Sequence, residues 1–197
     1  LGADIVTYST TKHIDGQGRM LGGAVLGSRT FIEEVFLPFY RQTGAAMSPF
    51  NAWVMLKALE TLPVRVQAQT DNAQYIADSL AQDSRVKSLI YPGHPSHPDY
   101  QIAQKQMSGA SSLIAFELEG GREKAFAFLD ALQLIDISNN LGDSKTLACH
   151  PASTTHANLT AQQRDMLQIK EGIIRLSVGL EDRRDLLDDI QQALQAI

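Results

Sequence analysis

A lysine follows three hydroxyl side chains near the start of the chain, in the stretch STTKHIDG. The hydroxyls belong to Ser9, Thr10 and Thr11, and the lysine is Lys12. A lysine amine that is shielded from water near other cations has a lowered pKa, and its neutral form makes a Schiff base with an aldehyde. Hydroxyl groups donate hydrogen bonds to phosphate, and Ser9 and Thr11 point to the same side of a continuing strand. The alternative is a surface lysine whose ammonium reaches water from a strand end.

Arg175 is a second unusual residue, because it lies within the apolar stretch IIRLSVG. On a strand it shares one face with Ile173 and Ser177, while the other apolar residues alternate onto the opposite face. A guanidinium in such a place needs a partner, and its fork matches a carboxylate through two hydrogen bonds. Two interpretations remain open: a salt bridge to an internal Asp or Glu, or an anchor for the carboxylate of a substrate.

Histidines and the single cysteine occur at spacings that metal sites also use. One set is His94 with His97, and the other is Cys149 with His150 and His156. Neither set has the repeated paired ligands of a zinc site, and the prolines around them are typical of turns. We therefore expect no metal centre. Cys149 lies in a predicted strand and is interpreted as a core thiol.

Composition narrows the class of protein. The chain has 197 residues, 44% of them hydrophobic, and a net charge of −5 without a cluster of basic residues. This excludes a general nucleic-acid or anionic-membrane binder. One cysteine excludes an intrachain disulfide framework and fits a reducing compartment. No apolar run suffices to span a bilayer and no signal-peptide pattern is present, so we expect a soluble cytoplasmic protein.

The residues of the first part are positioned by a loop between two strands. Strands are expected at 2–9 and 22–28, and the glycine-rich segment between them can approach a ligand closely. Its glycines match neither the dinucleotide-binding nor the P-loop fingerprint. Ser48 and Pro49 then predict a helix as its N-cap and first residue. The residues at core spacing on this helix are Trp53, Leu56 and Leu59.

Pro63 marks a predicted domain boundary, which gives domains 1–62 and 63–197. Beyond it, segments of strand and helix period alternate, so this part is expected to be a small sheet backed by helices in an α/β or α+β protein. The expected strands are 85–91, 111–121, 133–138, 146–152 and 172–181. The expected helices are 63–83, 122–132, 160–171 and 181–197.

Several segments resemble one known family, in the same order along the chain. YSTTKHIDGQGRMLGGAVLG resembles the cofactor-lysine segment of the Cys/Met metabolism enzymes that depend on pyridoxal 5′-phosphate (PLP). SPFNAW, PSHP, SNNLGDSKTLACHPASTTHANLT and IRLSVGLED are similar to later landmarks of that family. The resemblance implies an α/β fold. It makes 1–62 the end of a PLP-binding large domain with a mostly parallel sheet, and 63–197 a smaller α+β C-terminal domain.

The resemblance also implies roles for individual residues. Lys12 is the catalytic residue that binds PLP covalently, and Ser9 and Thr11 bind the cofactor phosphate. The hydroxyls that precede the lysine thus hold the phosphate while the lysine holds the aldehyde.

The implied substrate-binding residues are all in the C-terminal part. Arg175 matches the arginine that binds the α-carboxylate of the substrate. Ser138 and Asn139 lie in the segment that assists it. Lys12 and Arg175 then become opposite ends of one active site.

Two variant segments point to one branch of the family. IDGQGR and SNNLGDSKT resemble the O-succinylhomoserine sulfhydrylases, which implies a γ-replacement that converts O-succinylhomoserine and sulfide to homocysteine and succinate in methionine biosynthesis. The alternatives are a methionine or cystathionine γ-lyase, a cystathionine γ-synthase, or an inactive fragment. Arg19, in the variant loop, is a candidate contact for the succinyl carboxylate, with a surface salt bridge as the alternative.

The resemblance covers only the C-terminal half of such an enzyme. The half that carries the ring-stacking aromatic, the aspartate at the pyridine nitrogen and a phosphate loop is expected on a separate chain or further segment, with a truncated product as the alternative. Residues 1–62 are not expected to fold well alone. The family implies a homotetramer that acts on an amino-acid substrate and sulfide.

Overall fold

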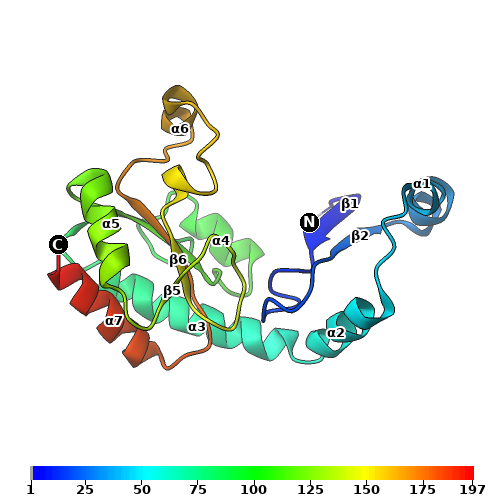
Figure 1. Cartoon of the computed structure of the whole chain (residues 1–197), viewed down its shortest axis with the longest axis horizontal. Coiled ribbons are helices and arrows are strands. Elements are labelled where there is room, and N and C mark those ends of the chain that lie inside the picture. Colours follow the sequence, from blue (N-terminus) through cyan, green and yellow to red (C-terminus); the bar gives the residue numbers. More distant parts are fainter. Residues whose placement is uncertain (1) are drawn as a thin grey trace. The chain divides into compact units, whose positions relative to one another are not determined.

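The computed structural model describes residues 2–197 and has an α/β fold. It divides the chain into two compact units, Leu1–Pro63 and Val64–Ile197. Figure 1 labels the α-helices of both units together with β1, β2, β5 and β6. Each unit contains its own sheet, so the residues that resemble a cofactor segment and those that resemble a carboxylate anchor belong to different units.

The first unit is built on an antiparallel pair of strands, β1 (Ile5–Ser9) and β2 (Gly23–Gly27). Ser9, the last residue of β1, pairs with Gly23. The predicted order of strand, glycine-rich loop and strand is therefore confirmed. The loop leaves and returns at the same end of the pair, which holds its two ends together.

Helices follow the strand pair. The π-helix η1 (Phe31–Phe36) continues into α1 (Leu37–Thr43), which ends at Gly44 in the left-handed conformation with φ of 70°. Glycine adopts this conformation without the steric cost that a Cβ imposes. This helical segment was not predicted from the sequence.

The start of α2 (Pro49–Leu59) follows the prediction, but its buried face does not. Ser48 Oγ accepts a hydrogen bond from the Asn51 N–H at 3.1 Å, as an N-cap does. The three residues expected in the core are exposed, and the buried residues are instead Val54 and Ala58. The expectation was wrong because α2 has apolar residues around most of its circumference, so spacing alone does not select a face.

The second unit is built on a five-stranded sheet in the order β3-β4-β7-β6-β5. Its pairs are antiparallel except for the parallel pair of β5 and β6, and β3 carries an irregularity between Val86 and Ser88. The strands are β3 (Val86–Ile90), β4 (Leu113–Leu118), β5 (Asp136–Ile137), β6 (Leu147–Cys149) and β7 (Ile173–Ser177). The helices are α3 (Leu62–Leu80), α4 (Tyr100–Gln106), α5 (Gly121–Ala131), η2 (Pro151–Ser153), α6 (Ala161–Met166) and α7 (Arg183–Gln195).

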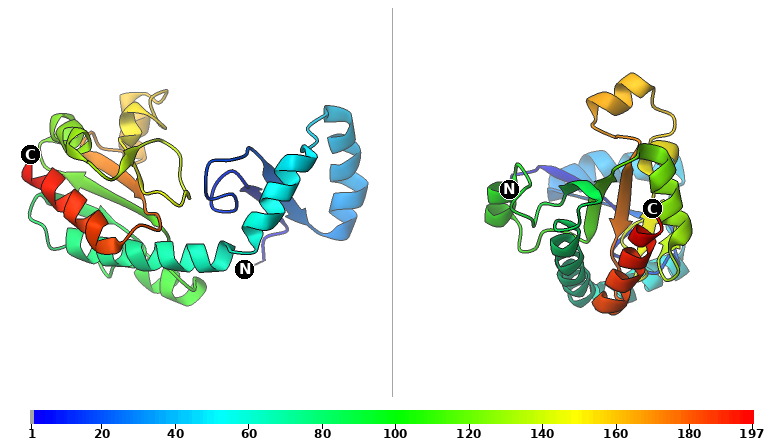
Figure 2. Two further views of the ribbon diagram at one scale, coloured as in Figure 1. Left: turned by 60° about the horizontal axis from the view of Figure 1, so that its bottom comes forward. Right: turned by 90° about the vertical axis from the view of Figure 1, so that its left-hand side faces the viewer.

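One apolar core joins this sheet to its helices. The buried residues of α3, α5 and α7 pack with every second residue of β4 and β7, and Phe116 meets Phe128 edge-on at 5.6 Å between ring centroids. Figure 2 shows α3 and α7 running beside the strands. Ile174 and Leu176 lie in this core, so alternation along β7 places Arg175 on the other face of the sheet.

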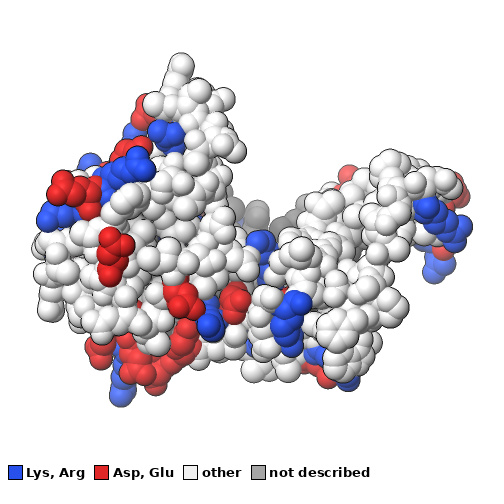
Figure 3. Space-filling model, in the orientation of Figure 1, with Lys and Arg blue, Asp and Glu red and all other residues white. Residues whose placement is uncertain are grey.

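Charge is unevenly spread over the second unit. Figure 3 shows acidic side chains gathered on the side where α7 lies. Asp182 caps α7 by accepting a hydrogen bond from the Arg184 N–H at 2.8 Å, and Asp185 lies in the first turn. Negative charge at a helix N-terminus is stabilised by the helix dipole. Within residues 2–197, no helix combines the length and apolarity that crossing a membrane requires.

Candidate functional site

Lys12 lies in a hydrogen-bonded turn that directly follows β1. Its backbone N–H donates to the Ser9 carbonyl at 3.1 Å, and the Gly16 N–H donates to the Lys12 carbonyl at 2.8 Å. A third bond, from the Asp15 N–H to the Thr10 carbonyl at 2.9 Å, closes the turn. Ser9 is exposed and Lys12 is half-buried. The turn therefore presents an amine and a hydroxyl from a backbone that is fixed at several points.

The two threonines of this turn have different environments. Thr11 Oγ1 accepts the Gly22 N–H at 3.0 Å and donates to the Gly22 carbonyl at 3.3 Å, which is long for a hydroxyl donor. Thr10 is fully buried, and its Oγ1 has no partner among the described residues. A Cβ on Gly22 would lie 2.6 Å from that oxygen, so this position requires glycine. Thr11 can exchange its long bond for one to a ligand, whereas the hydroxyl of Thr10 is buried beside Gly22.

The glycine-rich loop is held by a buried carboxylate that the sequence reasoning missed. The Asp15 side chain is fully buried and accepts hydrogen bonds from the Arg19 N–H at 2.6 Å and the Met20 N–H at 3.3 Å. Arg19 Nε forms a salt bridge with Asp15 Oδ1 at 2.9 Å. The salt bridge proposed for Arg19 is thus present, with a buried partner rather than a surface one. The Asp-Gly turn signal and the (i, i+4) spacing were the clues in the sequence.

Arg175 lies in the middle of β7, where its cross-strand neighbours are Ala115 and Cys149. Its Nη2 donates to the carbonyls of Asn139 at 2.9 Å and Asn140 at 3.1 Å. In the described part of the chain no carboxylate forms an ion pair with it. The internal salt bridge considered from the sequence is therefore not the arrangement observed.

The guanidinium of Arg175 also retains unused hydrogen-bonding capacity. Its Nε is buried and has no partner within residues 2–197. Two carbonyl oxygens contribute partial negative charge but do not neutralise a cation. Arg175 as a whole is partly buried, but its buried Nε donor without an acceptor costs about 1–3 kcal/mol. This environment suits an external carboxylate.

Ser138 and Asn139 lie in the loop that follows β5. The Ser138 N–H donates to the Ala148 carbonyl at 2.9 Å, which extends the pairing with β6. Ser138 Oγ accepts the Asn140 N–H at 3.2 Å and so shapes the turn whose carbonyls bind Arg175. The structure brings these residues together with Arg175 in the second unit, and Asn140 belongs to the same set.

A cavity of about 240 Å³ adjoins this loop. It lies among α5, β5 and β6, and its lining includes Leu129, Ile137, Ser138, Asn139, Cys149 and Thr154. Burial raises the pKa of the Cys149 thiol, although the positive charge of Arg175 opposes this shift. The thiol is therefore a neutral, buried group at the end of β6, as its place in a predicted strand indicated.

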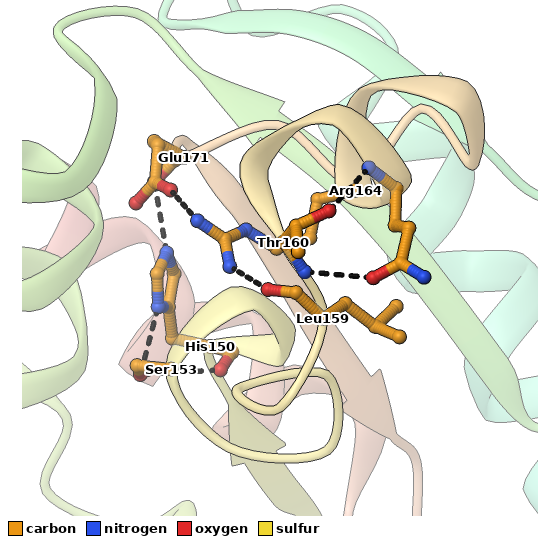
Figure 4. A network of polar contacts seen from close by, with 7 residues as sticks. His150, Ser153, Leu159, Thr160, Arg164 and Glu171 are labelled. Carbon is orange, nitrogen blue, oxygen red and sulfur yellow. Dashed lines mark hydrogen bonds and ion pairs between the residues drawn. The ribbon is translucent and has the colours of Figure 1, made fainter.

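Both ring nitrogens of His150 bind the protein. Nδ1 lies 2.9 Å from Ser153 Oγ, and Nε2 lies 2.9 Å from the Glu171 carbonyl. Arg164 extends this network by donating to the Leu159 carbonyl at 2.7 Å and pairing with Glu171 at 3.5 Å, as Figure 4 shows. Since a carbonyl only accepts, Nε2 carries the proton toward Glu171. This histidine ties two loops to β6.

The other histidines of the candidate metal sets also bind within their own turns. His94 Nδ1 lies 2.7 Å from Ser96 Oγ, and His97 Nδ1 accepts the Asp99 N–H at 3.1 Å. No three His, Cys, Asp or Glu side chains in the described residues are grouped as metal ligands would be. These contacts give His94 and His97 a structural role in the proline-rich loop.

Comparison with known proteins identifies the family to which the chain belongs. The model of the Cys/Met metabolism PLP-dependent enzyme family matches residues 1–195. The chain belongs to this family. PLP is the cofactor of the family, so the Lys12 turn can be tested against the needs of that molecule.

The chain is similar along its whole length to characterised members of the family. An O-succinylhomoserine sulfhydrylase from Mycobacterium tuberculosis is 50% identical over 98% of this chain and 49% of its own length. An L-methionine gamma-lyase from Pseudomonas putida is 44% identical over 100% of this chain and 50% of its own length. The chain thus spans about half the length of the curated relatives it matches.

Solved structures show the same fold. A cystathionine gamma synthase from Xanthomonas oryzae pv. oryzae, in complex with aminoacrylate and cysteine, has a TM-score of 0.95 and 37% sequence identity. The match covers 99% of this chain and 50% of that one. A cystathionine gamma-lyase from Lactobacillus plantarum, complexed with L-serine, has a TM-score of 0.94 and 33% identity.

The functional groups around Lys12 are those that PLP binding requires. An aldehyde needs an amine, and the Lys12 turn presents one in a half-buried position. A phosphate needs hydrogen-bond donors, and the exposed Ser9 hydroxyl together with the weakly engaged Thr11 hydroxyl supplies two. The donor set is therefore of the right type for the family cofactor.

Proposed function

We propose that the protein catalyses a PLP-dependent γ-replacement, in which O-succinylhomoserine and sulfide give homocysteine and succinate. The observation that carries the substrate class is the guanidinium of Arg175, held by two carbonyls with its buried Nε unpaired in the described residues. Such a group selects a carboxylate, which every amino-acid substrate provides. The similarity to the sulfhydrylase of M. tuberculosis supports the choice of reaction.

Each residue has a separate task in this proposal. PLP, when bound, supplies the electron sink that stabilises negative charge at the substrate Cα. Lys12 holds the cofactor and afterwards moves the Cα proton as general base and acid. Arg175 holds the α-carboxylate so that the Cα–H bond is correctly oriented, which lowers the entropic part of the barrier. Succinate leaves from Cγ, and hydrosulfide adds there.

Phosphate binding is assigned to the hydroxyls that precede the lysine. Ser9 is exposed at the end of β1, where its hydroxyl can donate without first losing a bond. Thr11 must turn its hydroxyl hydrogen away from the Gly22 carbonyl, a bond of 3.3 Å that costs little to exchange. We therefore expect Thr11→Val to weaken PLP binding, because valine has no hydroxyl to donate to the phosphate.

A second candidate is a methionine γ-lyase. The relative from P. putida, 44% identical over the whole chain, favours it. Substrate profiling separates the two reactions: succinylhomoserine with sulfide should be consumed faster than methionine is cleaved or cysteine accepted. Dominant methionine cleavage would rule out the sulfhydrylase.

The first experiment tests the role of Lys12. The purified protein is incubated with PLP, reduced with borohydride, and mapped by peptide mass spectrometry. A pyridoxyl group on Lys12 is expected, and Lys12→Ala should lose the adduct and turnover while still binding PLP noncovalently. A labelled Lys57 or Lys87 with an unlabelled Lys12 would refute the assignment. The same intact-mass run would reveal a companion polypeptide.

We further propose that the protein works in the cytoplasm as a homotetramer. The tetramer is implied by the family and the cytoplasmic location by the single cysteine, and neither rests on a contact in this structure. Light scattering during size-exclusion chromatography measures the assembly directly. A monomeric, active protein would contradict the tetramer.

A further inference from the structure

We infer that Ser177 is a positioning residue for the carboxylate anchor, an inference that rests on the role proposed for Arg175. Ser177 follows Arg175 by two positions on β7 and shares its face of the sheet. It is fully buried, and its Oγ accepts the Gly142 N–H at 2.8 Å. This bond joins the strand of the anchor to the loop whose carbonyls bind it.

The loop is held on both sides of the two carbonyls. Gly142 has a φ of 75°, a left-handed conformation that glycine adopts readily. On the strand side the loop is tied by the Ser138 N–H, which donates to Ala148, and by the turn bond from Asn140 to Ser138 Oγ. On the other side of the two carbonyls, the bond to Ser177 comes first along the chain. It is followed by bonds to the carbonyls of Asp143, from the Gln69 amide at 2.7 Å, and of Ser144, from the Leu180 N–H at 2.8 Å.

These ties determine where the guanidinium can point. Both N–H groups of Nη2 are directed to Asn139 and Asn140, so the position of those carbonyls sets the rotation of the guanidinium plane. Without the Ser177 hydroxyl, the buried Gly142 N–H loses its acceptor and the loop shifts to find another. A shift of about 1 Å in a binding group can cost about 100-fold in rate or affinity.

A neighbouring hydroxyl provides a matched control. Thr146 is also fully buried, and its Oγ1 accepts a backbone N–H, that of Gly179, at 2.8 Å. It lies beyond the loop carbonyls and is held by Glu181 through bonds of 2.6 Å and 2.8 Å. Its removal costs two hydrogen bonds, one from Gly179 and one to Glu181, without removing a bond to the loop carbonyls that bind Arg175.

The test measures carboxylate recognition directly. Wild type, Ser177→Ala, Ser177→Cys and Thr146→Val are purified with PLP. Calorimetry gives the Kd of L-norleucine, an amino acid without a γ leaving group, and of pentylamine, which lacks only its carboxylate. We expect Ser177→Ala to weaken norleucine binding about 10-fold and pentylamine binding less than about twofold, since one hydrogen bond of about 1.4 kcal/mol corresponds to a factor of ten.

The remaining variants make the result specific. Ser177→Cys, which keeps a weaker acceptor of similar size, should lie between wild type and Ser177→Ala, and it replaces the alanine variant if that one does not fold. Thr146→Val should lower the melting temperature at least as much as Ser177→Ala does, because it removes two hydrogen bonds, but it should leave the preference for norleucine over pentylamine unchanged. Equal losses for norleucine and pentylamine, or an unchanged preference in both Ser177 variants, would overturn the inference.

Failure of the proposed function gives a different result. If Arg175 were not the carboxylate anchor, wild type and Arg175→Lys would prefer norleucine over pentylamine to the same extent. If the anchor is right and Ser177 has no positioning role, Arg175→Lys loses the preference while the Ser177 variants keep it. The two ideas are thereby separated in one set of titrations.

Discussion

At the residue scale, Arg175 combines a full charge with acceptors that are only partly charged. Its geometry favours two parallel hydrogen bonds to a carboxylate, which a lysine cannot form. We expect Arg175→Lys to raise the Kd for an amino acid about 10- to 100-fold, because a hydrogen bond to a charged group contributes about 1.5–3 kcal/mol. Cofactor absorbance should be unchanged, since Arg175 is assigned to the substrate carboxylate and Lys12 to the cofactor aldehyde. An equal loss of PLP would contradict the assignment.

Asp15 gives a second prediction at this scale. Its carboxylate accepts two backbone N–H groups and the Arg19 guanidinium in the loop that follows Lys12. Asp15→Ala leaves these donors without an acceptor and should lower the free energy of unfolding by about 2 kcal/mol. Arg29→Ala is the control, because its ion pair with Glu33 is exposed and contributes less than about 1 kcal/mol. Urea denaturation measures both, and equal effects would argue against the role of Asp15.

The burial of Tyr91 predicts that the stability of the fold depends on pH at high pH. It is fully buried, and this burial, with a smaller contribution from Asp78, raises its pKa from 10.0 to about 12. Between these values the unfolded chain ionises Tyr91 while the folded chain does not. Its contribution to stability is therefore complete below pH 10 and is lost as the pH rises toward 12. A tyrosinate absorbance titration should show one group ionising late, and Tyr91→Phe should remove that step.

The partners of these residues limit what the sequence could predict about the site. Lys12 stood out because it follows an apolar strand, and Arg175 because it interrupts one. The acceptors of Arg175 are backbone carbonyls some 35 positions away in a loop, and every residue has a carbonyl, so no residue type identifies them. Asp15 was missed because an acidic residue in a turn is ordinarily exposed.

At the element scale, the sequence predicts where a helix begins better than it predicts which face of the helix is buried. The cap of α2 by Ser48 was predicted because it depends on residues close in sequence, and the capping box of Thr160 and Gln163 at the start of α6 is equally local. The alternation on β7 was also found. The buried face of α2 was not predicted, because apolar residues lie on several of its faces. Trp53 is exposed, whereas the adjacent Val54 is buried.

Asp189 gives a prediction for an element boundary. This buried residue of α7 accepts the N–H groups of Gln133, Leu134 and Ile135, at 2.8 to 2.9 Å, where the chain passes from α5 to β5. Asp189→Ala should lower the free energy of unfolding by about 3 kcal/mol, since three backbone donors, among them that of the buried Ile135, lose a charged acceptor. Its exposed neighbour Asp188 is the matched control, and Asp188→Ala should change stability by less than about 0.5 kcal/mol. Comparable values in thermal denaturation would refute this.

At the scale of the whole molecule, the apolar core is concentrated in the second unit. The core cluster runs from Ala73 to Leu194, while the strands of the first unit leave Ile5, Val6 and Leu26 exposed. We expect a fragment of residues 62–197 to fold cooperatively, because its core is complete within it. A fragment of residues 1–61 should not, because it buries too little apolar surface. Heat-capacity calorimetry of each fragment measures this, and a cooperative transition in the shorter one would contradict it.

The two edges of the five-stranded sheet are poor templates for another chain. β5 is only two residues long, and β3 interrupts its register between Val86 and Ser88, beside the charged Lys87. Short edge strands, bulges and lysines each prevent an incoming strand from forming a continuous ladder of hydrogen bonds. Intermolecular β-aggregation of the second unit should therefore begin from its unfolded state rather than from its native edges, and conditions that keep this unit folded should also keep it from aggregating.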